Sequence, residues 1–105
     1  MKIYLANGAY KTIKVTSTMT AEQLTTTIAE KLGMDRFARY FEVVEVKREQ
    51  QLRLNGSEKL LDLRAKWPMI FGQTGNETHL HCRFLVQLKK SAPPDAVALY
   101  EKACV

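Results

Sequence analysis

The stretch KIYLANGAYKTIKV near the start of the chain constrains the fold more than any other part of the sequence. Two alternating runs, 2–5 and 11–15, flank the dipeptide Asn7-Gly8. Asn-Gly between such runs is the strongest short-range signal for a β-hairpin, because a tight primed turn needs positive φ at its centre. Alternation predicts an inward and an outward set: Ile3, Leu5, Ile13 and Val15 inward, Lys2, Tyr4, Thr12 and Lys14 outward.

The composition indicates one globular domain. The chain has 105 residues, of which 46% are hydrophobic and 26% charged, which is the range of folded rather than disordered proteins. No apolar run approaches the length of a membrane span, and the N-terminal residues lack the pattern of a signal peptide. With only two cysteines, Cys82 and Cys104, we expect reduced thiols and a cytoplasmic protein.

A helix is predicted directly after the hairpin. Thr20 and Gln23 have the spacing of a capping box, in which each side chain bonds the backbone N–H of the other residue. Apolar residues follow at helical intervals: Ala21, Leu24, Ile28 and Leu32. Gly33 suits the left-handed position that ends a helix. We expect this helix to cover residues 20–32.

The rest of the chain predicts shorter elements. FEVVEV (41–46) and a run around Leu52 and Leu54 indicate two strands, LLDL (60–63) a small helix before Pro68, and 78–90 a further strand. The last strand carries one apolar face: Leu80, Cys82, Phe84 and Val86. After Pro94 the pattern predicts an amphipathic helix with nothing in residues 1–90 to pack against; its repeating positions are Val97, Tyr100 and Cys104.

This order of elements predicts an α+β chain with the ubiquitin-like β-grasp fold. We expect a mixed sheet of four to five strands, packed on one main helix, with the last strand beside the first and the second strand at a free edge. The ubiquitin-like lobe would cover 1–90. Residues 91–105 would form a linker and the start of a following helix, which belongs to a second lobe.

Several segments resemble the first lobe of FERM domains, of the myosin-tail or sorting-nexin type. KIYLANGAYKTIKVTSTMTAEQLTTTIAEKLGM resembles the opening of that lobe, RYFEVVEV its third strand, LLDLRAKWP its W-containing segment, and CRFLVQLKKSAPPDAVALYEKA the junction to the second lobe. The resemblance implies a non-catalytic adaptor module without a cofactor, at the membrane–cytoskeleton interface of the cytoplasm. It also implies partners: sister lobes, peptide tails of membrane or cargo proteins, a small GTPase or lipid headgroups.

Ras-association domains are similar to the same segments and form the alternative. In that family a cationic second strand pairs with the acidic switch of a small GTPase, and Lys11 and Lys14 would supply the cations. A third hypothesis, from another class, is a small basic nucleic-acid-binding protein, suggested by the net charge of +5. Proteins of that class usually have exposed aromatic residues among the basic ones. We do not expect them here, because we assign Phe37, Tyr40 and Phe41 to the core.

The sequence predicts no enzyme and no metal site. His79 and His81 share a strand face without further ligands nearby, so they are expected to be ordinary surface residues. The carboxylates of Glu42, Glu45 and Asp62 are expected to be solvated. We expect Cys82 to pack as a small hydrophobic residue.

The candidate binding residues are therefore cations. Lys2, Lys11 and Lys14 lie on the hairpin, where an acidic partner strand can pair with the edge, although edge lysines also serve to prevent aggregation. Arg36 and Arg39 follow the main helix and are candidates for contacts with anionic headgroups. For Trp67 there are two hypotheses, a plug at the bottom of the sheet or a contact with the second lobe.

Overall fold

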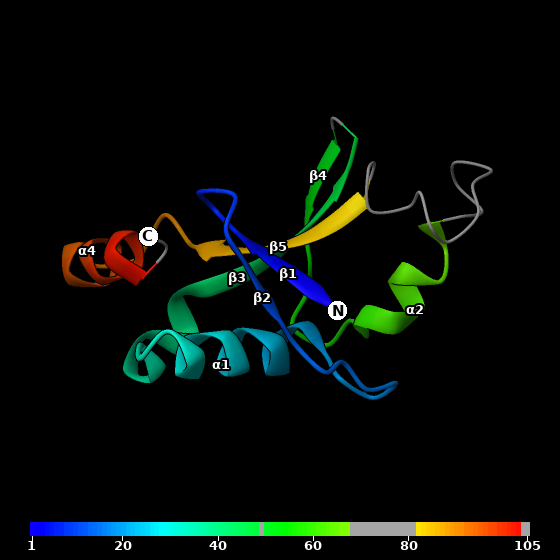
Figure 1. Ribbon diagram of the computed structural model, residues 1–105, viewed down its shortest axis with the longest axis horizontal. Helices are drawn as coiled ribbons and strands as arrows, with labels where there is room; N and C mark the ends of the chain where they lie inside the picture. The colour runs from blue at the N-terminus through cyan, green and yellow to red at the C-terminus, as the bar shows by residue number, and fades with distance from the viewer. Residues whose placement is uncertain (49, 68–81, 104–105) are drawn as a thin grey trace.

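One mixed sheet of five strands, in the order β2-β1-β5-β3-β4, organises the chain (Figure 1). The computed structural model describes residues 1–48, 50–67 and 82–103. Within these residues the strands are β1 Lys2–Leu5, β2 Tyr10–Thr12, β3 Phe41–Lys47, β4 Gln50–Arg53 and β5 Cys82–Leu88. The helices are α1 Ala21–Lys31, the 3₁₀ helix η1 Asp35–Tyr40, α2 Leu60–Arg64 and α4 Pro94–Ala103.

The pairing of the strands confirms the predicted ubiquitin-like topology. β5 runs parallel to β1, with Tyr4 opposite Leu85, so the last strand lies beside the first. β1 with β2, β3 with β4, and β3 with β5 are antiparallel. β2 is an edge of the sheet, as the sequence predicted.

The turn of the hairpin differs from the tight primed turn that Asn7-Gly8 predicted. The loop contains the three residues 6–8, because the N–H of Leu5 donates to the carbonyl of Ala9 (2.8 Å) and the N–H of Gly8 to that of Leu5 (3.1 Å). Gly8 has φ +90°, whereas Asn7 has no positive φ; its Oδ1 accepts from the N–H of Ala9 (3.0 Å). This extra residue sets the register in which Ile3 opposes Lys11.

Helix α1 confirms the prediction for residues 20–32. The N–H of Gln23 donates to Thr20 Oγ1 (3.3 Å), and the N–H of Thr20 donates to Gln23 Oε1 (3.0 Å), which completes the capping box. Gly33 has φ +69° after the last turn. The buried side of α1 covers one face of the sheet, where Leu24 and Ile28 pack in the core.

The core lies between α1 and that face of the sheet. Its inward residues from the strands, and from the position just after β2, are Ile3, Leu5, Ile13, Phe41, Val43, Cys82, Phe84 and Val86. Trp67 closes the core beyond α2: it is 4% exposed and its ring lies 4.8 Å from that of Phe84. Within the described residues, Trp67 is therefore the predicted plug.

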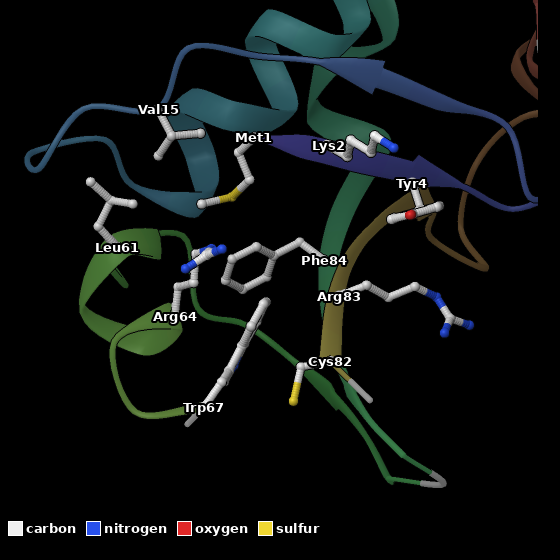
Figure 2. Close-up of a pocket in the computed structure, with 10 residues that line it drawn as sticks. All are labelled: Met1, Lys2, Tyr4, Val15, Leu61, Arg64, Trp67, Cys82, Arg83 and Phe84. Atoms are coloured by element: carbon white, nitrogen blue, oxygen red, sulfur yellow. The ribbon is translucent and has the colours of Figure 1, made fainter. Parts of the chain in front are cut away.

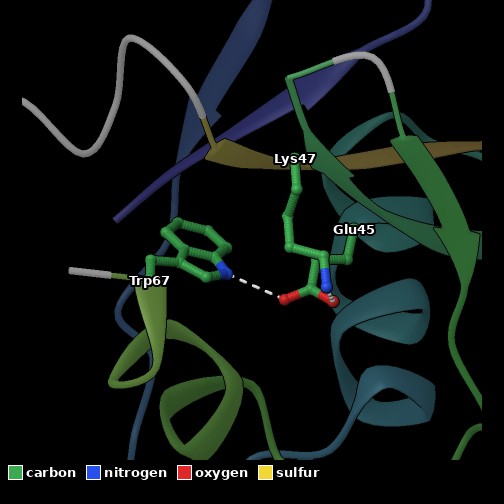
Figure 3. Close-up of polar contacts among 3 residues, drawn as sticks. All are labelled: Glu45, Lys47 and Trp67. Carbon is green, nitrogen blue, oxygen red and sulfur yellow. Dashed lines mark hydrogen bonds and ion pairs between the residues drawn. The ribbon is translucent and has the colours of Figure 1, made fainter. Parts of the chain in front are cut away.

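Two carboxylates of β3 are buried, so the prediction that they are solvated was wrong. Glu45 is 4% exposed; its Oε2 accepts from Trp67 Nε1 (2.7 Å) and its Oε1 lies 3.7 Å from Lys47 Nζ (Figure 3). Glu42 is 9% exposed and lies 3.2 Å from Arg53 Nε. The partners that make this burial possible are Lys47 in β3 itself, Arg53 in β4 and Trp67 after α2. Asp62 is exposed, as predicted.

The C-terminal helix packs on the domain, contrary to the expectation that nothing in residues 1–90 would cover it. Ala96 is completely buried and Tyr100 lies in the core, while Val97 is exposed. The division into 1–90 and 91–105 stays a prediction. The predictions for Leu80, Cys104, His79 and His81 lie outside the described residues.

Candidate functional site

The free edge of β2 is the candidate binding site. The N–H of Ile13 donates to the carbonyl of Met1 (2.8 Å) and the N–H of Leu5 to that of Ala9, so alternate residues of the second strand direct their backbone toward β1. In an antiparallel ladder the residues between them direct their backbone the other way. The N–H and carbonyl groups of Tyr10 and Thr12 therefore point away from the sheet, where a further strand can pair with them.

The outer face beside this edge carries cations and tyrosines. Lys2 opposes Thr12, and Tyr4 opposes Tyr10. Lys2 Nζ lies 4.6 Å above the ring of Tyr10, whose centroid is 5.9 Å from that of Tyr4. Tyr10 is 49% exposed, and Lys2 is exposed. Such a surface offers both charge and large flat contact area to a partner.

Lys11 lies on the opposite face from Lys14. Because Lys11 opposes the buried Ile3, its side chain leaves the strand on the side of the helix, where it is half-buried. Lys14 alternates with the buried Ile13 and is exposed on the outer side. The two lysines therefore flank the edge from both sides of the sheet, rather than lying together on one outward face.

Arg36 and Arg39 form a separate cationic surface on η1. Residues three apart eclipse each other in a 3₁₀ helix, so these two arginines share one ridge, while Phe37 and Tyr40 share the next. Arg36 lies 4.7 Å from the ring of Phe37, and Arg39 lies 4.9 Å from that of Tyr40. η1 leads into β3, which β1 and β5 separate from β2, so the structure does not join the arginines to the edge.

The prediction that Phe37, Tyr40 and Phe41 belong to the core is only partly right. Phe41 is buried in the core and its ring meets that of Tyr100, as expected of a core residue. Phe37 and Tyr40 are half-buried, and the arginines cover them. Stacking of guanidinium groups on these rings was not visible in the sequence, because it depends on the 3₁₀ conformation of residues 35–40.

A groove of about 580 Å³ opens between β1, α2 and the start of β5 (Figure 2). Trp67, Phe84 and Cys82 form its inner wall, and Lys2 belongs to both the groove and the outer face beside β2. Among the described residues, the charged side chains that line it are all cations: Lys2, Arg64 and Arg83. The groove thus extends the positive surface of the hairpin, which the spacing of these residues in the sequence did not reveal.

Cys82 is an unreactive core residue. Burial raises the pKa of the Cys82 thiol above its usual value of 9.0, and the nearby carboxylate of Glu45 raises it further, while Lys47 and Arg48 lower it. The thiol therefore stays protonated near neutral pH, which makes it a poor nucleophile. This agrees with the prediction that it packs as a small hydrophobic residue.

The described residues contain no group of three or more His, Cys, Asp or Glu side chains placed to hold a metal ion. The same part of the chain has no helix long and apolar enough to cross a bilayer.

Comparisons with solved structures agree with the fold. The chain is similar to the Rasip1 RA domain, with 22% identity, a TM-score of 0.68, and coverage of 97% of this chain and 94% of that one. It is also similar to the Dictyostelium discoideum myosin VII MyTH4-FERM MF1 domain, with 13% identity, a TM-score of 0.72 and 97% coverage. The MF2 domain of that myosin gives 15% identity, a TM-score of 0.72 and 98% coverage.

The chain spans only 22% of the length of each of the two myosin chains. A search of curated proteins finds no match. A model of the family described as Ras association (RalGDS/AF-6) domain matches residues 1–91. The family match favours the Ras-association alternative over the FERM lobe, whose likeness is one of fold. By this match the chain belongs to the Ras association (RalGDS/AF-6) domain family, whose members are non-catalytic binding modules.

Proposed function

We propose that this domain binds a small GTPase of the Ras family through the free edge of β2. A strand of the partner would pair with the outward backbone groups of Tyr10 and Thr12, and acidic side chains of the partner would meet Lys2, Lys11 and Lys14. Membership of the Ras-association family supports the class of partner. The observation that carries the proposal is an edge with outward-pointing backbone groups between cations on both faces of the sheet.

The other edge of the sheet fits an acidic partner less well. β4 has two glutamines, a half-exposed Leu52 and one cation, Arg53. That cation already lies against the carboxylate of Glu42 at 3.2 Å. β2 instead has three nearby lysines, for which no ion pair is found within the described residues. Complementary charge speeds association and selects the partner, so we favour β2.

The test is a titration of Ras-family GTPases, loaded with a non-hydrolysable GTP analogue, against wild type and the Lys11→Glu/Lys14→Glu variant. We expect the variant to lose about tenfold or more in affinity, because repulsion replaces attraction at two positions next to the partner strand. The Arg36→Glu/Arg39→Glu variant has the same change in net charge on the separate surface, and it should keep the affinity of wild type. Equal losses of affinity in both variants would mean that binding depends on net charge alone and not on the edge of β2.

A second candidate function belongs to the ridge of Arg36 and Arg39, which we propose contacts anionic lipid headgroups. Lys89 donates to the carbonyl of Arg39 (3.2 Å) and so adds a further cation beside the ridge. Half-buried aromatic rings under the guanidinium groups suit an interface between apolar and charged layers. Each cation near an anionic leaflet contributes about 1 kcal/mol.

Sedimentation with phosphatidylcholine vesicles, with and without phosphatidylserine, tests this second function. Wild type should sediment only with the anionic vesicles, and the Arg36→Glu/Arg39→Glu variant should stay in solution. The Lys11→Glu/Lys14→Glu variant serves here as the control of equal charge and should sediment like wild type. If both variants lose binding to the same degree, the ridge has no special role.

The wider setting of the domain also stays a proposal. We infer that it belongs to a cytoplasmic adaptor that connects membrane, cargo or cytoskeletal partners, with sister lobes of the FERM type as one arrangement. The likeness in fold to the myosin lobes supports this arrangement, together with the predicted division at residue 90. Limited proteolysis of the protein expressed from its natural gene would test it: a second protected lobe beside this domain is expected, and protection of this domain alone would contradict the arrangement.

A further inference from the structure

Helix α4 lies outside the residues that the family model matches, yet it is docked on the domain. The model covers 1–91, and α4 is Pro94–Ala103. The helix sits beyond the end of the sheet from which the β1–β2 turn projects (Figure 1). Ala96 is completely buried, and the ring of Tyr100 meets that of Phe41 edge-on, with centroids 5.6 Å apart.

The hydroxyl of Tyr100 connects the hairpin turn to the centre of the sheet. It donates to the carbonyl of Val86 in β5 (2.6 Å) and accepts from the N–H of Ala6 (3.0 Å). Ala6 is the first residue of the turn, directly after β1, and Val86 lies opposite Leu5 in the parallel pair. One hydroxyl thus holds together three parts of the chain: the turn, the central strand and α4.

The hairpin needs such a contact because β2 is short. β2 has three residues and, at the edge of the five-stranded sheet, pairs only with β1, so few backbone hydrogen bonds hold it. One end of the second strand is held where Met1 and Ile13 bond each other, at 2.8 Å in both directions. The other end is the turn, and Tyr100 bonds it at Ala6.

We propose that Tyr100 is a positioning residue for the partner-binding edge, and that α4 is part of the binding unit. By fixing the turn to β5, the hydroxyl holds the β1–β2 hairpin in the orientation that a partner strand requires. A preorganised edge binds more tightly because it has less to order when the partner arrives. This proposal rests on the proposed function, since it assumes that the edge of β2 is the site.

The variant Tyr100→Phe separates this role from packing, because it keeps the ring that lies against Phe41 and removes the hydroxyl that bonds Ala6 and Val86. Hydrogen exchange measured by NMR should show about three- to tenfold faster exchange at the amide of Ala6. The affinity for loaded Ras-family GTPases should fall by a similar factor, at a temperature where the variant is fully folded. If Tyr100 served only to pack the core, the exchange rate of Ala6 and the affinity would both equal those of wild type.

Leu63→Ala is the matched control. Leu63 packs on the core from α2, far from the turn in the chain, so its truncation lowers stability without touching the hydroxyl. It should leave the exchange of Ala6 and the affinity near wild type. The proposal is overturned if Tyr100→Phe leaves the exchange of Ala6 unchanged, if its affinity equals that of wild type, or if Leu63→Ala weakens binding equally.

The two proposals fail in different ways. If wild type binds none of the loaded GTPases, the proposed function is wrong, and with it the effect on affinity. The exchange of Ala6 still decides whether Tyr100 holds the hairpin in place. If wild type binds and Tyr100→Phe binds equally well, the proposed function stands and the positioning role falls.

Discussion

The residues whose environment was hardest to foresee are buried polar ones. Glu45 and Trp67 are 22 positions apart in the chain, and no pattern in the sequence links them. Charged residues in a strand are usually solvated, and only the arrival of the indole N–H and of Lys47 makes burial of Glu45 tolerable. The inward positions of Ile3, Leu5 and Ile13 were predictable, because they follow from alternation alone.

The hydrogen bond between Glu45 and Trp67 should contribute to the stability of the domain. Glu45→Ala leaves the indole N–H without its acceptor inside the core, so we expect the free energy of unfolding to fall by about 1–3 kcal/mol. Urea denaturation followed by tryptophan fluorescence measures the loss. Asp62→Ala, which removes an exposed carboxylate, should change stability by less than about 0.5 kcal/mol. Equal effects of the two substitutions would contradict the importance of this buried contact.

Among the elements, α1 was predictable and the hairpin turn was only partly so. The capping box of Thr20 and Gln23 and the left-handed Gly33 are local signals, and the structure follows them. Asn7-Gly8 is also a local signal, but it fits more than one loop length. The structure uses the three-residue loop, in which only Gly8 has positive φ, and this choice gives the register of β2. The orientation of Lys11 follows from that register.

The positive φ of Gly8 should make this turn position sensitive to substitution. Gly8→Ala should cost about 1–2 kcal/mol of stability, because a side chain disfavours the left-handed region. A Cβ at this position meets nothing within 4 Å, so the cost comes from φ +90° and not from a clash. Thermal unfolding followed by circular dichroism measures it. Gly8→Asn should be milder, since Asn tolerates this region better than Ala. Unchanged stability in Gly8→Ala would contradict the positive φ.

At the scale of the whole molecule, the order of elements was enough to predict the ubiquitin-like fold. The family was harder to assign, because Ras-association domains and FERM lobes share the positions that carried the resemblance. The docking of α4 was not predictable either. Its burial depends on Tyr100 reaching Val86 and Ala6, which the fold brings to one end of the sheet. A helical pattern of three turns does not indicate where such a helix packs.

Pairing of a partner strand with β2 can be observed directly. Amide hydrogen exchange of the domain, alone and with a loaded Ras-family GTPase, tests it at single residues. We expect new protection at Tyr10 and Thr12, whose N–H groups point away from the sheet, and little change at Lys11, whose backbone already pairs with Ile3. A complex that leaves Tyr10 and Thr12 unprotected, or that protects β4 instead, would show that the partner does not pair with β2.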